Sequence, residues 1–294
     1  MATLLLGDCL EVMKTLTDKS IDCFICDLPY GCLSGGPAIG KSEERARASG
    51  SCTWDVKINL AEFWTQVKRL AKNDHTPVLM FCNTKFGFDL YNSNPSWFRY
   101  DLVWDKGRGV SFLLASKMPM KSHEMIYVFS KKGTFYNRVD ISGDFGPSQG
   151  GGKGSICYGI DNTKMRSFKP WKQSSKSRAQ SGKYLGLPFG DISGDKIFSG
   201  GDGVRCALSV IHAGSHAKSG KHPTEKPLAL YKWLLERYCP PGGTVLDPTA
   251  GSFNAIIAAE ELGLEGIGIE KDKTFYQKAV KKWIDCSDNI IEHV

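Results

Sequence analysis

The chain has 294 residues, of which 41% are hydrophobic and 23% charged, and its formal net charge is +7. These values are typical of a soluble globular protein with one large domain, or one domain and an insertion, and the positive charge permits a polyanionic partner. No apolar run approaches the roughly 20 residues of a membrane span, and the first residues lack a secretory signal, so we expect a cytoplasmic protein without a membrane partner.

The first predicted elements are a strand and a helix. Leu4–Leu6 is an apolar run, Gly7 forms a turn, and apolar residues at helical spacing continue to Leu16. Asp8 follows the glycine and either caps this helix or accepts a hydrogen bond from a ligand. Taken alone, these residues favour the cap.

A mostly apolar run at 20–26 predicts a buried strand, and the residues after it form the centre of the predicted site. Asp27 and Tyr30 follow the carboxyl end of this strand, which is the edge where open α/β sheets bind ligands. Pro29 has a fixed φ and no N–H group, so it holds the carbonyl of Leu28 in place. The Asp27 carboxylate and the Leu28 carbonyl can accept two N–H bonds of a planar amine while Tyr30 stacks on its ring. The alternative is a strand followed by an ordinary proline turn.

The ten cysteines form no regular framework. Cys23 and Cys26 have the spacing of half a zinc site, but no second pair at metal spacing follows them. We therefore expect no metal site, and reduced thiols with a structural role.

The middle of the first half alternates between strands and helices. Residues 32–53 have no apolar periodicity, and beside a site such a loop is either a lid or a surface linker. The sequence then predicts a helix at 60–71, a strand at 78–81, a helix at 86–91 and strands at 98–104 and 124–129. This alternation predicts an α/β fold, with a Rossmann-like, mostly parallel sheet covered by helices on both faces.

The composition changes between residues 133 and 221. Lys and Arg outnumber Asp there and Glu is absent, so this segment carries the positive excess of the chain. Aromatic residues lie among the charges, which suits contacts to phosphates together with stacking on bases. We predict an inserted region that carries all the nucleic-acid affinity, while the core carries none; the alternative is a solvated insertion. Its candidate DNA-binding residues are Lys169, Trp171, Lys172, Lys176 and Arg178.

The last part of the chain predicts a nucleotide-binding half. Residues 222–227 begin a helix that continues to Tyr238, since a proline in the first turn suits a helix start. A strand, a turn, a helix and a strand follow, at 244–246, 247–254, 255–262 and 266–269. Glu270 then comes where an acid can accept both hydroxyls of a ribose. The turn matches neither a dinucleotide-binding nor a phosphate-binding loop, so a cofactor with a ribose and no phosphate fits, and S-adenosylmethionine is the common one.

Three of these motifs resemble those of the DNA amino-methyltransferases, which methylate exocyclic amines with S-adenosylmethionine. Residues 27–30 resemble the Asp-Pro-Pro-Tyr signature, with Leu28 in place of the first proline; a backbone carbonyl at this position would serve equally well. Residues 247–252 resemble the cofactor turn Asp-Pro-Phe-x-Gly-Ser, with Phe-Asn at 253–254 in place of the usual Gly-Thr. Residues 222–227 resemble the element His-Pro-Thr-Gln-Lys-Pro.

The order of the motifs resembles the circularly permuted beta class of this family. The resemblance implies a catalytic half of the core at 1–132, a target-recognition region at 133–221, which itself stays unmatched, and a cofactor-binding half at 222–294. It implies that the catalytic residues are Asp27, Leu28, Pro29 and Tyr30. It implies that the cofactor-binding residues are Asp8, Cys9, Asp27, Thr224, Lys226, Asp247, Thr249, Gly251, Ser252, Asn254 and Glu270.

The function implied is a site-specific DNA methyltransferase that acts on adenine N6 of a base flipped out of double-stranded DNA. Asp27 favours adenine, because the family tends to place Ser there when the target is cytosine N4. Cytosine N4 is the nearest alternative, followed by RNA or a protein glutamine, and an inactive DNA-binding relative is the alternative from another class. A homodimer and a cognate restriction endonuclease are further partners that this function allows.

Overall fold

The computed structural model describes residues 2–31, 56–110, 112, 115–139, 141–142, 204–205, 207–214 and 225–291, with 141–142, 204–205 and 285–291 as backbone only. The chain divides into two compact units, Met1–Val139 with Leu208–Val294, and Asp140–Ala207. In the second unit the described part is an antiparallel pair of short strands, β6 (Ile141–Ser142) and β7 (Val204–Arg205). All other described elements belong to the first unit.

The first unit is built on one mixed sheet of the described strands. Its order is β1 (Ala2–Leu6), β10 (Glu265–Glu270), β9 (Thr244–Asp247), β2 (Cys23–Cys26), β3 (Val78–Cys82), β5 (Lys121–Phe129), β4 (Phe98–Val110) and β8 (Val210–His212). Only β5 runs antiparallel to its neighbours, β3 and β4, and every other pairing in this sheet is parallel. The prediction of a mostly parallel sheet is therefore confirmed.

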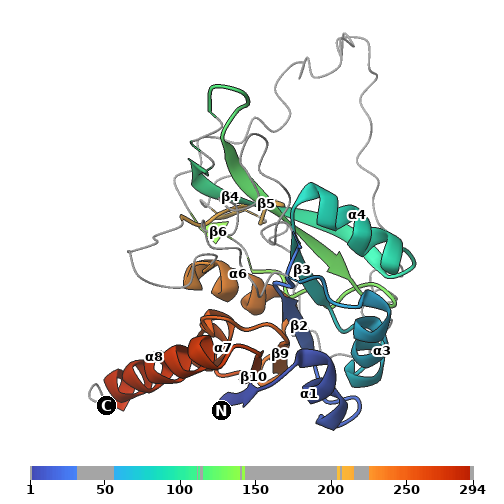
Figure 1. The fold of residues 1–294 in the computed structure, drawn as a ribbon, viewed down its shortest axis with the longest axis vertical. Helices are drawn as coiled ribbons and strands as arrows, with labels where there is room; N and C mark the ends of the chain where they lie inside the picture. Colours follow the sequence, from blue (N-terminus) through green and yellow to red (C-terminus); the bar gives the residue numbers. More distant parts are fainter. Residues whose placement is uncertain are drawn as a thin grey trace, which may run out of the picture. The chain divides into compact units, whose positions relative to one another are not determined.

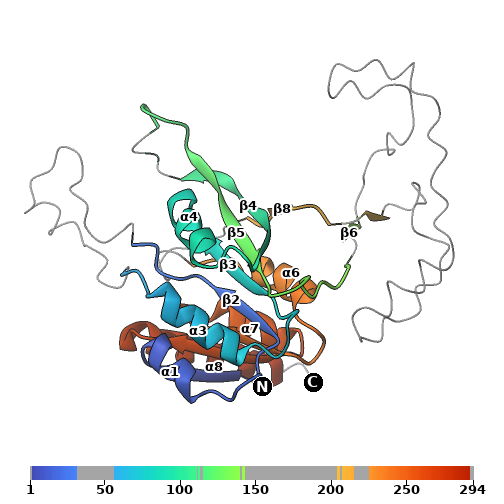
Figure 2. The same cartoon turned by 90° about the vertical axis from the view of Figure 1, so that its right-hand side faces the viewer.

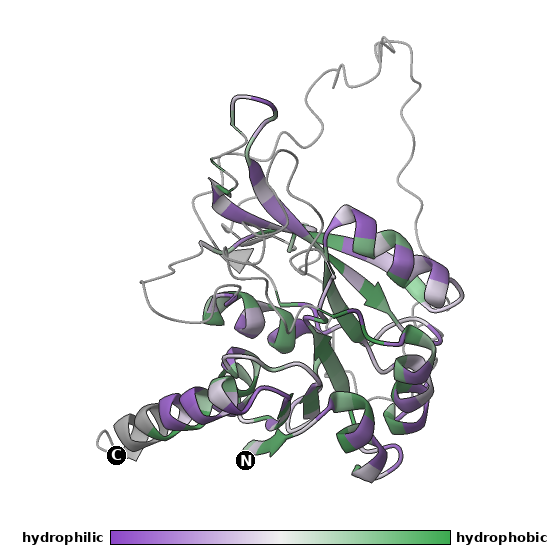
Figure 3. Ribbon diagram, viewed as in Figure 1, coloured by the Kyte–Doolittle hydropathy of each residue, from purple (hydrophilic) through white to green (hydrophobic). Residues whose placement is uncertain are grey.

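Helices cover both faces of the sheet, as predicted (Figure 1). One face carries α1 (Cys9–Thr15), α3 (Leu60–Leu70) and α4 (Thr84–Ser93), and the other carries α6 (Leu228–Tyr238) and α7 (Asn254–Glu261). The last helix, α8 (Lys273–Ile291), packs near β1 through its first turns. Hydrophobic residues concentrate along the strands between these layers (Figure 3), which is why the strands appear in the sequence as short apolar runs.

Strand β2 shows how the sheet separates its two apolar layers. Successive side chains of a strand point to opposite faces, so Cys23 and Ile25 pack under α6 and α7, whereas Phe24 and Cys26 pack under α1 and α3. Cys23 and Cys26 therefore lie on opposite faces of the sheet and cannot share a metal ion. In the described part of the chain no cluster of His, Cys, Asp and Glu could hold a metal, and no helix there is both long and apolar enough to cross a membrane.

Helix α3 follows the sequence pattern closely. The Asn59 side chain accepts hydrogen bonds from Ala61 N at 3.1 Å and Glu62 N at 3.4 Å, which satisfies the first free N–H groups of the helix. Phe63, Trp64, Val67 and Leu70 then recur at helical spacing and are all buried. Helix α4 begins two residues before the predicted start, because the Asn83 side chain caps it by accepting from Phe86 N at 2.9 Å.

Strands β4 and β5 are longer than predicted. The sequence predicts strands at 98–104 and 124–129, but the strands extend to Val110 and back from Lys121. Beyond Asp105 the additional residues pair only with each other among the described strands, and the apolar alternation that predicts a strand is missing there. Strand β8, which pairs with β4, lies within the predicted insertion and was likewise not predicted.

The parallel strands bring the predicted site residues to one edge. β1, β2 and β9 end beside one another with the last residue of β10, and Gly7 N donates to the carbonyl of Glu270 at 2.9 Å. Asp8, Asp27 and Thr249 follow the ends of three of these strands. Residues distant in the sequence are thus placed on the carboxyl edge, where α/β sheets bind ligands.

Replacement of Gly268 by alanine tests the packing of α7 on the sheet. A Cβ atom at Gly268 would press into the ring of Phe253 and approach Ile256 Cγ1 at 2.9 Å. Because Phe253 is fully buried, we expect Gly268→Ala to lower the unfolding free energy by about 1–3 kcal/mol. Urea denaturation should show no change for Gly133→Ala, where a Cβ meets nothing within 4 Å. Equal stabilities of the two variants would contradict this packing.

Candidate active site

A cavity of about 620 Å³ opens at the carboxyl edge of the sheet. Of the residues predicted from the sequence, those that line it are Asp8, Cys9, Asp27, Leu28, Pro29, Tyr30, Lys226, Thr249, Gly251, Ser252 and Glu270. Asp247 and Asn254 are buried and do not line it. Thr224 and the candidate DNA contacts Lys169, Trp171, Lys172, Lys176 and Arg178 lie outside the described residues, as does the loop at 32–53.

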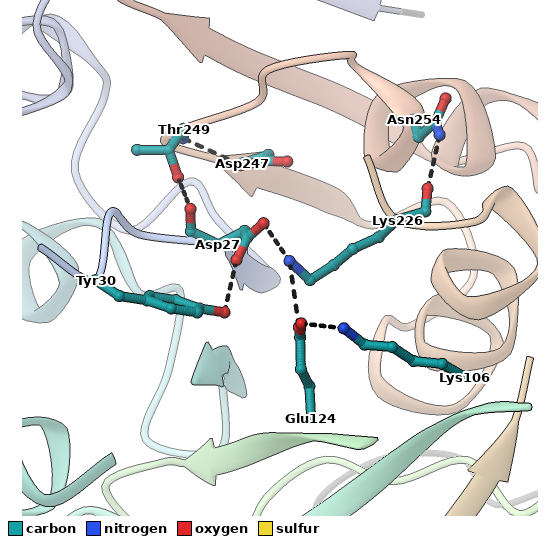
Figure 4. Close-up of polar contacts among 8 residues, drawn as sticks. All are labelled: Asp27, Tyr30, Lys106, Glu124, Lys226, Asp247, Thr249 and Asn254. Carbon is teal, nitrogen blue, oxygen red and sulfur yellow. Dashed lines mark hydrogen bonds and ion pairs between the residues drawn. The ribbon is translucent and has the colours of Figure 1, made fainter. Parts of the chain in front are cut away.

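Three contacts fix the position of Asp27 (Figure 4). Its Oδ1 accepts a hydrogen bond from the Tyr30 hydroxyl at 2.9 Å, and its Oδ2 forms an ion pair with Lys226 Nζ. The Thr249 hydroxyl donates to the backbone carbonyl of Asp27 at 3.0 Å, which joins the turn after β2 to the turn after β9. The carboxylate is thus held in one orientation while 21% of the side chain stays exposed.

Leu28 and Tyr30 are anchored by the core on one side of the cavity. The Leu28 side chain is buried in the apolar layer that also holds α1 and α3, which explains why leucine is accommodated at this position. The Tyr30 ring stacks on Phe86 with centroids 5.1 Å apart and an interplanar angle of 26°. Burial, and then the Asp27 carboxylate, raise the pKa of Tyr30 well above its ordinary value, so the hydroxyl stays protonated as a donor.

Lys226 lies at the centre of a chain of alternating charges. Its side chain is only 4% exposed, and its ammonium group lies 4.6 Å from the centre of the Phe81 ring and 3.8 Å from Glu124 Oε2. Glu124 Oε1 in turn accepts from Lys106 Nζ at 2.6 Å. Asp27 completes the series, so two carboxylates and two ammonium groups alternate in Figure 4. Each buried charge thereby has an opposite charge beside it, as burial requires.

Glu124 and Lys106 were not predicted as site residues. Burial acts to raise the pKa of Glu124, but the ammonium groups of Lys226 and Lys106 outweigh it and hold this pKa below its ordinary value. Glu124 is therefore a carboxylate at neutral pH. The sequence offers one usable signal, an isolated acid at the start of the apolar run that forms the end of β5.

Lys226 was predicted to bind the cofactor, and the structure directs its ammonium group to Asp27 and Glu124. Asn254 was predicted in the same set, but its side chain supports the backbone beside Lys226. Its amide donates to the Lys226 carbonyl at 2.7 Å and to Glu225 Oε1 at 2.9 Å. Asn254 thus holds the segment that carries Lys226 in place, which is a reason for asparagine at this position.

The turn after β9 is tied to Glu270. Gly251, in the left-handed region with φ of 51°, donates its N–H to Glu270 Oε2 at 2.9 Å, and Asp272 N donates to Oε1 at 2.7 Å. Burial raises the pKa of Glu270 above its ordinary value, although these N–H groups oppose the effect. Phe253 also has a positive φ of 57° and places its ring under α7, so Phe253 is part of the core at this turn.

Asp8 caps α1 and also forms an ion pair at the cavity wall. Its side chain accepts from Leu10 N at 3.0 Å, and its Oδ2 lies 2.9 Å from Lys271 Nζ. The Lys271 ammonium lowers the pKa of Asp8 below its ordinary value. Burial raises the pKa of the neighbouring Cys9 thiol to about 12, so Cys9 presents a neutral group to the cavity. The sequence alternative of a helix cap at Asp8 is confirmed, and the cap leaves Asp8 on the wall of the cavity.

Comparison with known proteins identifies the family of this chain. A family model described as DNA methylase, for N6 and N4 methyltransferases, matches residues 21–281. The chain belongs to this DNA methylase family. Over 63 residues the methylase is 41% identical to the type II methyltransferase M.HindIII of Haemophilus influenzae, a match that spans 21% of this chain and 20% of that relative.

The chain is similar in fold to solved structures of DNA methyltransferases. It is similar to the M1.HpyAVI–SAM complex over 96% of this chain and 100% of that one, with a TM-score of 0.53 and 17% identity. It is similar to the cytosine-N4-specific PvuII DNA methyltransferase over 95% of this chain and 85% of that one, with a TM-score of 0.58 and 12% identity. The predicted Rossmann-like methyltransferase fold is thereby confirmed.

Asp247 provides a test of the electrostatics beneath the cavity. Burial raises its pKa to about 8, although Thr249 N donates to its Oδ1 at 3.1 Å. Between the unfolded pKa of about 4 and pH 8, the folded protein binds a proton that the unfolded chain has lost, so folding stability falls as pH rises, by about 1.4 kcal/mol per unit.

The isosteric variant Asp247→Asn lacks this titration and keeps the acceptor for Thr249 N. We therefore expect its unfolding free energy, relative to that of the unsubstituted protein, to increase between pH 5.5 and pH 7.5 in parallel urea titrations. Glu270 is present in both proteins, and its charge raises the Asp247 pKa less than burial does, so the change in the difference reports mainly Asp247. A difference between the two proteins that does not change with pH would show that Asp247 is ionised in the fold.

Proposed function

We propose that this DNA methylase transfers the methyl group of S-adenosylmethionine to the N6 amine of an adenine displaced from double-stranded DNA. The observation that carries the proposal is the shared cavity: the turn Asp27–Tyr30 and the turn Pro248–Ser252 line it together with Glu270. An acceptor for an amine and an acceptor for a ribose therefore face the same space. The resemblance of residues 27–30 to the adenine-type signature supports adenine as the target.

The cavity suits a cofactor with a ribose and no phosphate. Glu270 uses one acceptor site on each carboxylate oxygen for Gly251 N and Asp272 N, and a carboxylate has about four, so capacity remains for ribose hydroxyls. Asp8 and Cys9 line the same wall and would lie beside the base of the nucleoside. When bound, S-adenosylmethionine supplies an electrophilic methyl group on a sulfonium sulfur.

Asp27 would orient the target amine. The amine nitrogen is a poor nucleophile while its lone pair is delocalised into the ring, and hydrogen bonds to Asp27 and the Leu28 carbonyl would favour tetrahedral geometry at nitrogen. The Asp27 carboxylate would stabilise the positive charge that develops on this nitrogen during transfer, and would accept the proton that the nitrogen loses. Lys226 and Tyr30 keep the carboxylate aimed throughout.

Tyr30 would stack on the displaced base. Phe86 covers one face of the Tyr30 ring, so the base must use the opposite face. The stacking would offset part of the unpairing cost, which is a few kcal/mol. A cytoplasmic location, the target-recognition role of residues 133–221, a homodimer and a cognate restriction endonuclease stay predictions from the sequence.

Asp27→Ala tests the proposed chemistry. Because Asp27 is proposed to contact the amine, we expect a loss of methyl transfer of about 100-fold or more, with a fold retained by circular dichroism. The measurement is the transfer of labelled methyl groups to DNA, followed by mass spectrometry of the nucleosides. Asp18→Ala, which removes an exposed carboxylate paired with Arg69 of α3 and lies away from the cavity, is the matched control and should keep full activity.

The nucleoside formed separates the alternatives. N6-methyladenine supports the proposal, N4-methylcytosine moves the target to cytosine, and no labelled nucleoside from the unsubstituted protein points to an inactive DNA-binding relative. Turnover of Asp27→Ala close to that of the unsubstituted protein would remove Asp27 from the mechanism.

Glu270→Ala tests the cofactor half separately. Loss of hydrogen bonds to a charged acceptor should weaken S-adenosylmethionine binding by about 10- to 100-fold in calorimetry. Glu265→Ala is the control, because Glu265 is exposed at the other end of the same strand, β10. If both variants bind equally well, Glu270 does not contact the ribose.

A further inference from the structure

Beyond the sheet, β4 and β5 continue as a two-stranded arm, defined here as the described residues 106–110, 112 and 115–123. Strand β8 pairs with β4 only as far as Asp105, and β3 pairs with β5 only from Met125 onward, so among the described strands the arm pairs only with itself. Since β5 is antiparallel to β3, its first residues lie at the carboxyl end of β3, the edge that carries Asp27. Figures 1 and 2 show the arm projecting from the sheet.

The root of the arm is held firmly at the cavity. Lys106 Nζ contacts Glu124 Oε1 at 2.6 Å, and Asp105 Oδ2 lies 3.1 Å from His212 Nδ1 on β8. The pairing register shifts between Asp105 and Val110, where Gly107 has a φ of 66° and donates to Asp105 Oδ1 at 3.0 Å. Such an irregularity bends a strand pair and fixes the direction in which it leaves a sheet.

The surface of the arm combines positive charge with exposed apolar side chains. It contains no Asp or Glu; Lys106 pairs with Glu124 at its root, whereas Arg108 and Lys117 are exposed and Lys121 is partly exposed. Figure 3 shows its strands as mainly hydrophilic, in contrast to the same strands within the sheet. Among its described residues, three large apolar side chains are nevertheless exposed, Phe112 at 78%, Met118 at 51% and Met120 at 44%. Exposed apolar residues within a charged surface indicate a binding partner.

We propose that this arm contacts the DNA duplex beside the target base. Lys117 and Lys121 bind phosphates, and Phe112 and Met118 enter the base step that the displaced nucleotide leaves open. Phe and Met are among the side chains that proteins insert between base pairs, and the arm begins at the edge where the base must enter. A second copy of the chain suits the arm less well, because two arms in a symmetric contact would repel each other.

This inference rests on the proposed function and changes one part of the sequence interpretation. The sequence predicts that residues 133–221 carry all the DNA affinity, whereas the arm belongs to the unit that holds the cavity. The insertion would then recognise the site, while the arm assists displacement of the base. Two properties of the arm can be tested separately. Its phosphate contacts determine how DNA affinity depends on salt, and its part in base displacement determines how the rates of methyl transfer differ between paired and unpaired targets.

The first experiment measures DNA binding by the full chain as a function of salt concentration. For Lys117→Gln/Lys121→Gln, the slope of log affinity against log salt should fall in magnitude by about 1.8, from two lost phosphate contacts. The control Lys14→Gln/Lys19→Gln removes two exposed lysines at the opposite edge of the sheet and should leave the slope unchanged. An unchanged slope in the first variant overturns the phosphate contacts.

The second experiment measures methyl transfer to a DNA target. This target is identified beforehand by sequencing DNA that the unsubstituted protein has methylated. Phe112→Ala/Met118→Ala should lower the rate by about tenfold or more on a paired target, and much less when the target base is mismatched and needs no displacement. Phe88→Ala, which removes a ring that is 64% exposed on α4, is the control and should not alter either rate. Equal losses on both targets, or no loss on either, overturn the role in base displacement.

The outcomes also distinguish this inference from the proposed function. Methylation of cytosine leaves both comparisons valid, because each is made on the base that the protein modifies. An unsubstituted protein that binds DNA without methyl transfer refutes the proposed function, while the salt comparison still tests the arm. A concentration-dependent dimer in light scattering that is lost in Phe112→Ala/Met118→Ala assigns the arm to a second copy and overturns the proposal.

Discussion

The ion pair between Asp27 and Lys226 is the interaction on which the site depends. The two residues are 199 positions apart, and the pair joins the turn after β2 to the segment before α6. Taking charges out of water costs several kcal/mol per ion, so either charge alone would be strongly unfavourable in this place. Additional contacts from Tyr30 and Glu124 offset this cost. The cavity therefore forms only when the first and last parts of the chain come together.

The alternation of charge around Lys226 has a consequence for recognition. Asp27 and Glu124 together carry two negative charges, and Lys226 and Lys106 balance them. A carboxylate that is already paired and hydrogen-bonded needs little reorganisation when a ligand arrives. The cavity thus offers a fixed acceptor for N–H groups instead of a mobile charge, which suits a neutral amine better than a cation.

The sequence predicts the parts of this structure that local patterns determine. Buried parallel strands are short apolar runs, and the residues that follow them, such as Asp27 and Thr249, necessarily reach one edge of the sheet. The sequence does not reveal which side chains of a turn point inward. Asp247 matches a cofactor motif and Asn254 replaces a residue of it, yet Asp247 is buried beneath the turn and Asn254 supports the backbone at Lys226.

Two further features escape sequence interpretation because they depend on long-range pairing. Glu124 contacts Lys226 only because β5 enters the sheet in reverse beside β3. The arm lacks the alternation of a half-buried strand because, among the described strands, its two strands pair only with each other. The alternation of apolar and polar residues in a sequence arises from burial, so an element that stays exposed to contact a partner does not show it. The elements most difficult to predict are therefore those that face a partner.

Glu124 connects these features. One of its carboxylate oxygens contacts Lys106 at the root of the arm, and the other faces Lys226, which holds Asp27. A movement of the arm that separated Lys106 from Glu124 would leave this buried carboxylate with Lys226 as its nearest cation. The electrostatic attraction of Lys226 would then be shared differently between Asp27 and Glu124. The position of the arm and the hold on Asp27 are thus linked through one side chain, without any change in the sheet.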